Sequence, residues 1–364
     1  MAARLWPLAK DGAHRRRGAR IFAAHYVGPS RGGYIGIAAQ VGLTRERIRV
    51  LMGRLLRAAR SSPLQAPVAL ERLEALRAAL PLPIELLQER LAPQLGRGCD
   101  VEDLLRFVEQ VLQAKTDVRR QNIWFGGRNT TILHDATDRA PWPGLALRLA
   151  RAHVERLGSA HPELIAGALA QHYDRHPPAA DLIATLRLHP GFTPLVHGWF
   201  TLSETETWID IKVRKLFAAG AVQVPIDDLM SAIASDWRYV GAQDKPPPML
   251  PHHHVVIALL RTRPWISLNH RYAITLRDPA AIDGALTAVE QAMVARLQEC
   301  SGVTAARDLV RSGAASGRTA AAARMALALS PVFVPLGQQL YALRAQRIDP
   351  LALAKATKAR RRNS

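Results

Sequence analysis

A group of charged residues near the N-terminus has the types and spacing needed to contact DNA bases. Arg45, Glu46 and Arg49 follow Thr44 at the start of an expected helix. An arginine guanidinium can donate two parallel hydrogen bonds to guanine, and a glutamate carboxylate can accept one from the amino group of cytosine. A helix that enters the major groove by its N-terminal end brings such side chains to the base edges. We therefore predict that these three residues read DNA sequence.

The segment Tyr34–Leu51 has the pattern of a helix-turn-helix, which would position these charges. Such a motif needs a small residue where its helices cross, a turn residue that tolerates positive φ, and apolar residues between the helices. Ala38 and Gly42 meet the first two needs, and Thr44 is suited to the N-cap of the second helix. We expect that helix to run from about Arg45 to Ala59. The inward apolar residues would be Ile37, Val41, Leu43, Ile48 and Leu51.

Further arginines of the same helix are suited to phosphate contacts. Arg47, Arg54 and Arg57 lie largely outside its apolar stripe, which we expect to contain Ile48, Leu51, Leu55 and Leu56. Phosphate contacts of this kind set the register of a protein on DNA while other side chains read bases. An ordinary arginine-rich surface helix is the alternative, but it would not require the small residue, the turn and the cap together.

The string IAAQVGLTRERIRVLMGRLLRAAR resembles the fourth region of bacterial sigma factors, which reads an upstream promoter element. The match is strongest over TRERIR, Thr44–Arg49, and the resemblance covers about residues 15–60. It implies that Arg45, Glu46 and Arg49 contact bases or backbone. The motif lies at the start of this chain, whereas in a sigma factor it lies at the C-terminal end. The acidic, aromatic-rich segment that sigma factors use for DNA melting is not found in this sequence. The resemblance therefore supports DNA reading but not promoter opening.

The net charge of +19 is concentrated at the two ends of the chain. Residues 1–66 contain 13 Lys and Arg against Asp11 and Glu46, and residues 344–364 contain 7 against Asp349. Their net charges are thus +11 and +6, which leaves the long middle nearly balanced. Basic segments attract polyanions by releasing counterions condensed on phosphate. A GC-rich genome would also favour arginine, but it would do so along the whole chain.

Composition indicates a cytoplasmic, nucleoid-associated protein of more than one domain. The 364 residues contain no apolar run of membrane-spanning length and no apolar stretch after the first basic residues, so we expect neither a membrane segment nor a secretory signal. The two cysteines, Cys99 and Cys300, form neither a disulfide framework nor a zinc motif. This cysteine usage is typical of a reducing compartment.

The segments Leu186–Leu202 and Leu327–Leu343 share a pattern at a constant offset of 141 residues, and Leu259–Leu276 is a weaker third copy. In each copy a helix ends near a proline, and an aromatic residue, a turn and a short strand follow. Trp265 of the third copy takes the place of Phe192 in the first. Such repeats indicate modular construction, and a helix followed by a small hairpin is the end of a winged helix.

The sequence therefore predicts a mainly α protein, in which an N-terminal helix-turn-helix precedes tandem winged-helix-like modules with small β-hairpin wings. The expected spans are 1–66 for the helix-turn-helix, 67–138, 141–202, 203–277 and 278–345 for the modules, and 346–364 for a basic tail. In the first module we expect helices over 68–80, 83–94 and 100–113 and a hairpin around Gly126-Gly127. In the third we expect a capping box at Ser203–Glu206 and a linker at 241–254 that lacks helix, and in the fourth a helix over 278–299.

Among the modules, the expected first wing offers the best phosphate ligands, namely Arg119, Arg120 and Arg128. The expected third helices of the second and fourth modules each carry a single arginine. We interpret tryptophan and phenylalanine at wing positions as core residues in preference to base-stacking residues. The modules are thus expected to add contacts or assembly to an N-terminal reading motif.

Two other groups could do chemistry, and the sequence argues against each. His252, His253 and His254 are adjacent, and adjacent residues of a helix point in different directions, so we expect a solvated helix start and no metal. Asp210-Ile211-Lys212 matches part of a nuclease motif, but no further carboxylates are evident to hold Mg²⁺, which favours surface charge. We expect no catalytic residue, no metal and no cofactor.

The leading hypothesis is a non-enzymatic protein that binds double-stranded DNA in a sequence-specific way, as a transcription regulator or promoter-associated factor. RNA polymerase and other copies of the chain are further candidate partners, and a membrane is not. One alternative is an architectural or replication/partition protein of a plasmid or mobile element, which would assemble on repeated sites. Another is an accessory nucleic-acid-binding subunit of a larger complex.

Overall fold

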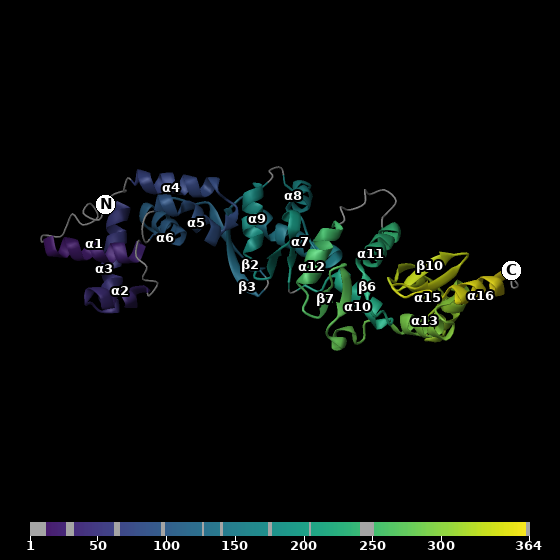
Figure 1. The fold of residues 1–364 in the computed structure, drawn as a ribbon. Helices are drawn as coiled ribbons and strands as arrows, with labels where there is room; N and C mark the ends of the chain where they lie inside the picture. The colour runs from purple at the N-terminus through teal and green to yellow at the C-terminus, as the bar shows by residue number, and fades with distance from the viewer. Residues whose placement is uncertain are drawn as a thin grey trace. The chain divides into compact units, whose positions relative to one another are not determined.

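The computed structural model describes residues 12–26, 33–61, 66–95, 99–125, 127–138, 141–173, 177–203, 205–240 and 251–361. It divides into two compact units, one of Met1–Leu147 with Leu169–Pro190 and one of Arg148–Ala168 with Gly191–Ser364. Both are mainly helical with small antiparallel sheets, as expected from the sequence (Figure 1). Within the described residues, each helix is too short or too polar to cross a lipid bilayer.

Three helices form the N-terminal part of the first unit, namely α1 (Gly12–Tyr26), α2 (Gly33–Val41) and α3 (Arg45–Ser61). Helix α1 packs against both α2 and α3, because each presents an apolar stripe that must leave water. Tyr26 at the end of α1 packs edge-on against Phe107, and its hydroxyl donates a hydrogen bond of 3.2 Å to Gln110. The helices around the predicted reading motif are therefore anchored to the segment that follows them.

That following segment contains α4 (Pro67–Ala78), β1 (Leu82–Pro83), α5 (Ile84–Leu95), α6 (Val101–Phe107), β2 (Val118–Phe125) and β3 (Arg128–Asp135). Strand β3 lies between β1 and β2, and a π-helical turn, Val108–Leu112, continues α6. The expected start of a helix at Pro83 is wrong, because Pro83 pairs with Ile132 as the last residue of β1. The hairpin turn contains Gly127 at φ +89, whereas Gly126 lies outside the described residues.

The same order of elements, a helix, a short strand, two helices and a hairpin, recurs along the chain. The second occurrence contains α7 (Trp142–Leu157), α8 (Pro162–Ala170), α9 (Ala179–Arg187), β4 (Phe192–Pro194) and β5 (Phe200–Leu202), with a single bridge from Ala160 to Phe200 in place of the short strand. The third contains α10 (Trp208–Ala218), β6 (Val224–Pro225), α11 (Ile226–Val240), α12 (His253–Arg261), β7 (Ile266–Leu268) and β8 (Ala273–Leu276). The fourth contains α13 (Ala288–Glu299), β9 (Val303–Ala305), α14 (Ala306–Ala315), α15 (Ala320–Leu329), β10 (Phe333–Gly337) and β11 (Leu340–Leu343), before α16 (Pro350–Arg361).

In each complete sheet the last strand lies in the centre, with the orders β1-β3-β2, β6-β8-β7 and β10-β11-β9. The predicted module boundaries stay a prediction, and the division into two compact units passes within residues 141–202.

The hairpin registers show how closely the repeated segments correspond. Phe192 pairs with Leu202, and Phe333 pairs with Leu343, so the offset of 141 residues holds in space. In the third hairpin it is Ile266 that pairs with Leu276, which makes the expected place of Trp265 wrong by one residue. Side chains alternate along a strand, so this shift directs Ile266 into the core and leaves Trp265 only partly buried.

The helix starts of the third and fourth segments correct two further expectations. Thr207, and not Ser203, caps α10: its hydroxyl accepts from the amide of Asp210, and its own amide donates to the Asp210 carboxylate at 2.9 Å. Glu204 of the expected box lies outside the described residues. Helix α13 begins only after Thr287, which forms the same reciprocal box with Glu290, so the expected helix over 278–299 is shorter and follows a 3₁₀ turn, Pro279–Ile282. The predicted linker falls largely on residues 241–250, which lie outside the described residues.

Candidate nucleic-acid interface

The turn between α2 and α3 has the local geometry that the sequence predicts for a helix-turn-helix. Gly42 adopts φ +65, and the amide of Leu43 donates to the carbonyl oxygen of Ala38 at 3.0 Å. The Thr44 hydroxyl accepts a hydrogen bond of 3.2 Å from the amide of Arg47, which is the N-cap bond expected of it. These bonds satisfy backbone groups at the end of α2 and the start of α3 and so define where α3 begins.

The apolar side of α3 differs from the expected stripe at two positions. Ile48 and Met52 are completely buried and Leu55 nearly so, whereas Leu51 and Leu56 are only half-buried. Met52 lies four residues after Ile48 and three before Leu55, which places all three on one face. The expected stripe therefore includes Leu51 and Leu56, which are only half-buried, and omits Met52, which is completely buried.

The opposite surface of α3 is strongly basic. All six polar residues that the sequence analysis selected on this helix are exposed, namely Arg45, Glu46, Arg47, Arg49, Arg54 and Arg57. Sequence reasoning did not select Arg16, Arg17 and Arg20 of α1, which are exposed on the same three-helix bundle. The run HRRRGAR would have indicated them, because it concentrates charge directly before an apolar stripe. The bundle therefore offers a dense set of cations to a polyanion.

Glu46 and Arg49 are not independent, because they form an ion pair across one turn of α3. The Arg49 Nη2 lies 2.6 Å from Glu46 Oε1, and Nε lies 3.0 Å from Oε2. This hydrogen bonding lowers the pKa of the Glu46 carboxyl from its usual value. Both side chains are two-thirds exposed, so the pair is screened by water and contributes little to stability. It does hold the guanidinium in one orientation at the surface predicted to meet DNA.

The β2–β3 hairpin, which the sequence analysis predicts to be the first wing, is less available to phosphates than expected. Arg120 binds Glu102 through two hydrogen bonds of 3.2 and 2.8 Å, and Arg128 lies 3.0 Å from Glu85. Arg119 is exposed on β2, and no carboxylate among the described residues pairs with it. Two of the three predicted phosphate ligands are thus offset by acidic residues that lie 18 and 43 positions away in sequence.

Trp124 contradicts the interpretation of wing aromatics as core residues. It lies near the tip of the β2–β3 hairpin, opposite Asn129, and 62% of its surface is exposed. Trp199, Phe200 and Phe333 do follow the expectation, because they are buried, whereas Phe192 and Trp265 are only partly buried. Strands β2 and β3 extend over eight residues each, and the Trp124–Asn129 pair is the last but one before the turn.

The expectation of surface charge at Asp210-Ile211-Lys212 is wrong. Asp210 and Lys212 are each only 3% exposed, and Asp210 accepts hydrogen bonds of 2.9 and 2.7 Å from the buried Arg263 of the α12–β7 connection. Helix α10 is covered on more than one side, because Asp210 faces Arg263 while Lys212 borders a hollow that Met325 and Leu329 also line. Asp210 and Lys212 are therefore internal, and Asp210 forms an ion pair with Arg263, whereas Ile211 between them is exposed.

Lys212 makes the stability of the second unit depend on pH. Burial, followed by repulsion from Lys215 and Arg344, lowers the pKa of Lys212 from 10.5 to about 7. The unfolded chain binds more protons than the folded chain between those two values, so stability is lowest below pH 7 and increases as pH rises towards 10.

We expect Lys212→Met to raise the free energy of unfolding at neutral pH by about 1–3 kcal/mol, because it removes a buried charge. The variant should also lack most of the increase in stability above neutral pH. Urea unfolding measured at several pH values tests this, with the exposed Lys358 replaced by Met as the control. An unchanged dependence on pH in Lys212→Met would show that this lysine is not its cause.

His252, His253 and His254 lie closer together than the sequence analysis expects. One ring atom from each residue lies within 4.8 Å of the others, so the expectation that the three rings point apart is wrong. His252 is the N-cap of α12 and has an extended backbone, at φ −60 and ψ 153. It therefore departs from the helical spiral that would direct its side chain away from the next two.

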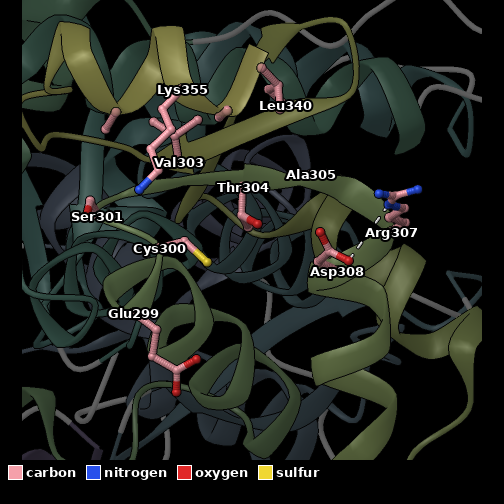
Figure 2. Close-up of a pocket in the computed structure, with 12 residues that line it drawn as sticks. Glu299, Cys300, Ser301, Val303, Thr304, Ala305, Arg307, Asp308, Leu340 and Lys355 are labelled. Carbon is pink, nitrogen blue, oxygen red and sulfur yellow. Dashed lines mark ion pairs between the residues drawn. The ribbon is translucent and has the colours of Figure 1, made fainter. Parts of the chain in front are cut away.

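The fourth segment contains a hollow of about 410 Å³. Figure 2 shows it between the stretch Cys300–Ala305 and α16, from which Lys355 projects. Cys300 is a free thiol, but none of the described residues that line the hollow is a histidine that could activate it as a nucleophile. The carboxylates of Glu299 and Asp308 and the cations of Arg307 and Lys355 give it a mixed charge with no single ligand preference.

Comparison with models of known protein families finds no match for the chain, and comparison with curated proteins finds no similar sequence. The exposed charges of α3 and the packing that supports them are therefore the basis on which a function is assigned.

Proposed function

We propose that the protein binds double-stranded DNA in a sequence-specific way through α3, as a transcription regulator or promoter-associated factor. One observation carries this proposal, namely the first turns of α3. They are capped by Thr44, anchored by the buried Ile48, and expose Arg45 beside the Glu46–Arg49 pair. Their side chains are those that hydrogen-bond to guanine and cytosine, on a helix that its neighbours hold in place.

In this proposal α3 lies in the major groove and the surrounding arginines hold the DNA backbone. Arg47, Arg54 and Arg57 on α3 and the exposed arginines of α1 would contact phosphates, with Arg119 of the first wing as a further ligand. The resemblance of Thr44–Arg49 to sigma region four supports the same role for α3. Contacts with phosphate provide affinity and salt dependence, whereas the base contacts provide specificity.

We also propose that the four repeated segments are winged-helix units, because each has the order helix, short strand or bridge, two helices and hairpin. The central position of the last strand in three of their sheets supports this assignment. These units would serve as a scaffold for the reading helix, through assembly or secondary DNA contacts.

Selection of duplexes from a random pool with the full-length protein tests the proposed function. We expect one sequence motif that spans about one to two turns of DNA, since a single helix reads one major groove. The logarithm of the affinity should fall linearly with that of the salt concentration, by about 0.9 for each neutralised phosphate. A folded protein that enriches no motif in this experiment does not read DNA sequence.

A second candidate function is assembly on repeated sites, as in an architectural or replication/partition protein. The fourfold recurrence of one element order favours it, because tandem modules can track along a polymer. Genome-wide binding of the tagged protein separates the two candidates. Isolated peaks at promoters support a regulator, and one extended array at a single locus supports assembly.

The Glu46–Arg49 pair leads to a prediction about specificity. We expect Glu46→Gln to strengthen binding to random duplexes by a few-fold, because a negative charge leaves the interface. The preference for the best duplex should fall by about tenfold, because the carboxylate no longer accepts from cytosine or orients Arg49. Dissociation constants for both duplexes measure the two effects.

Glu299→Gln is the matched control, since Glu299 forms an exposed pair of the same spacing with Arg296 in the second unit. It should leave both constants unchanged. An unaltered ratio between the two duplexes in Glu46→Gln would remove Glu46 from the reading residues.

A further inference from the structure

We propose that His252, His253 and His254 bind one divalent first-row transition-metal ion, such as Zn²⁺, at the start of α12. The three rings are neighbours in space: the centroid of His253 lies 4.0 Å from that of His252 and 3.9 Å from that of His254. The outer two centroids are 5.2 Å apart. Imidazole nitrogen is a ligand that zinc, copper and nickel share, whereas calcium and magnesium prefer oxygen.

The backbone explains how the ring of His252 can approach the other two rings. Side chains of consecutive residues within a helix do not face one another. His252 precedes the first helical turn and has an extended backbone, so only His253 and His254 follow the helical spiral. The extended backbone of the N-cap directs the His252 ring towards the rings of His253 and His254. A helical backbone at this position would direct it away from them.

The spacing of the ring nitrogens is close to what an ion requires. One candidate ligand atom from each ring lies within 4.8 Å of the others. A tetrahedral ion with bonds of about 2.0–2.1 Å to nitrogen holds its ligands roughly 3.4 Å apart. Rotation of the side chains can close this difference, because His252 and His254 are exposed and not confined by a packed core. Water can complete the coordination.

Two local effects oppose the binding of an ion and limit its affinity. The His252 Nδ1 accepts a long hydrogen bond of 3.5 Å from the amide of His254, and a neutral ring has only one lone pair to offer. Loss of this N-cap bond should reduce the affinity by about fivefold. The positive end of the helix dipole also disfavours a cation at this position.

Calorimetric titration of the full-length, tag-free protein with Zn²⁺ at about pH 7.5, where free imidazole is neutral, tests the site. We expect one ion per chain. Titration with Co²⁺ should produce the visible absorption of a low-symmetry nitrogen site. His253→Gln and His254→Gln should each weaken binding by at least about tenfold, because each removes a ligand.

Two variants separate ligand loss from damage to the helix. His252→Asn keeps an N-cap acceptor and so preserves the start of α12, yet it should weaken binding as much as the other substitutions. His270→Gln removes an exposed histidine from the hairpin of the same segment and should leave binding unchanged. The proposal is overturned if the wild-type protein shows no saturable binding, or if the variant lacking all three histidines binds the ion equally well.

Discussion

Replacing Arg45 and Arg49 together with alanine should weaken binding to the best duplex by about a hundredfold or more. Each arginine that forks onto a guanine is worth about 1–3 kcal/mol of discrimination, so the loss of two removes most of the sequence preference. Arg49 is oriented by Glu46 and both arginines lie in the first turns of α3, the end of the helix that the proposed docking would bring to base edges. Fluorescence anisotropy with the selected duplex and a scrambled duplex measures both affinity and preference.

The pair Arg54 and Arg57 supplies the matched control, because it lies on the same helix and removes the same charge. We expect Arg54→Ala with Arg57→Ala to weaken both duplexes nearly equally. It should reduce the salt dependence by roughly two counterions, as expected for two lost phosphate contacts. If the Arg45 and Arg49 variant also weakens both duplexes equally, α3 contributes charge but does not read sequence. If the Arg45 and Arg49 variant binds both duplexes with unchanged affinity, the DNA-binding site lies elsewhere in the protein.

Replacing Asp210 with asparagine should lower the free energy of unfolding of the second unit by about 3–5 kcal/mol. The amide still fits the space and can still accept from Thr207, but it leaves the Arg263 guanidinium without its negative partner. Arg263 is only 9% exposed, so water cannot replace the lost carboxylate. Thermal and urea unfolding, followed by tryptophan fluorescence, measure the loss.

A double variant shows whether the unpaired charge is the cause. Asp210→Asn with Arg263→Met removes both charges and should be more stable than Asp210→Asn alone, because no buried ion remains. Asp308→Ala is the surface control: its pair with Arg307 spans 3.9 Å and is more exposed, so its removal should cost less than about 1 kcal/mol. A double variant as unstable as the sum of the single variants would contradict this explanation.

Local features of the fold were predictable from the sequence because their causes lie within a few residues. The turn at Gly42, the cap at Thr44 and the buried Ile48 depend on chain geometry and on helical spacing. The hairpins around Phe192 and Phe333 were predicted for the same reason. In each, a proline marks the end of a helix and the following aromatic residue marks the start of a strand. Small errors, such as Trp265 for Ile266, arose where a shift of one residue reverses the face of a strand.

Partners distant in sequence decided the features that were predicted wrongly. Arg120 and Arg128 have the composition of phosphate ligands, but Glu102 and Glu85 approach them only after the helices pack beside the sheet. Trp124 resembles a core residue in sequence, yet it is exposed in the folded chain. The number of arginines in the β2–β3 hairpin therefore overstates how many are available to bind phosphate, because carboxylates of the folded chain pair with two of them.

The local structure of the predicted reading motif is determined by the sequence itself: Thr44, the exposed Arg45, Glu46 and Arg49, and the glycine turn before them all follow from local spacing. Only the tertiary structure decided that Glu46 holds Arg49, that Asp210 and Lys212 are internal, and that three adjacent histidines converge. The physical reason is the range of the interactions. Backbone preferences act over one or two turns, whereas burial and ion pairing depend on which surfaces meet when distant segments pack.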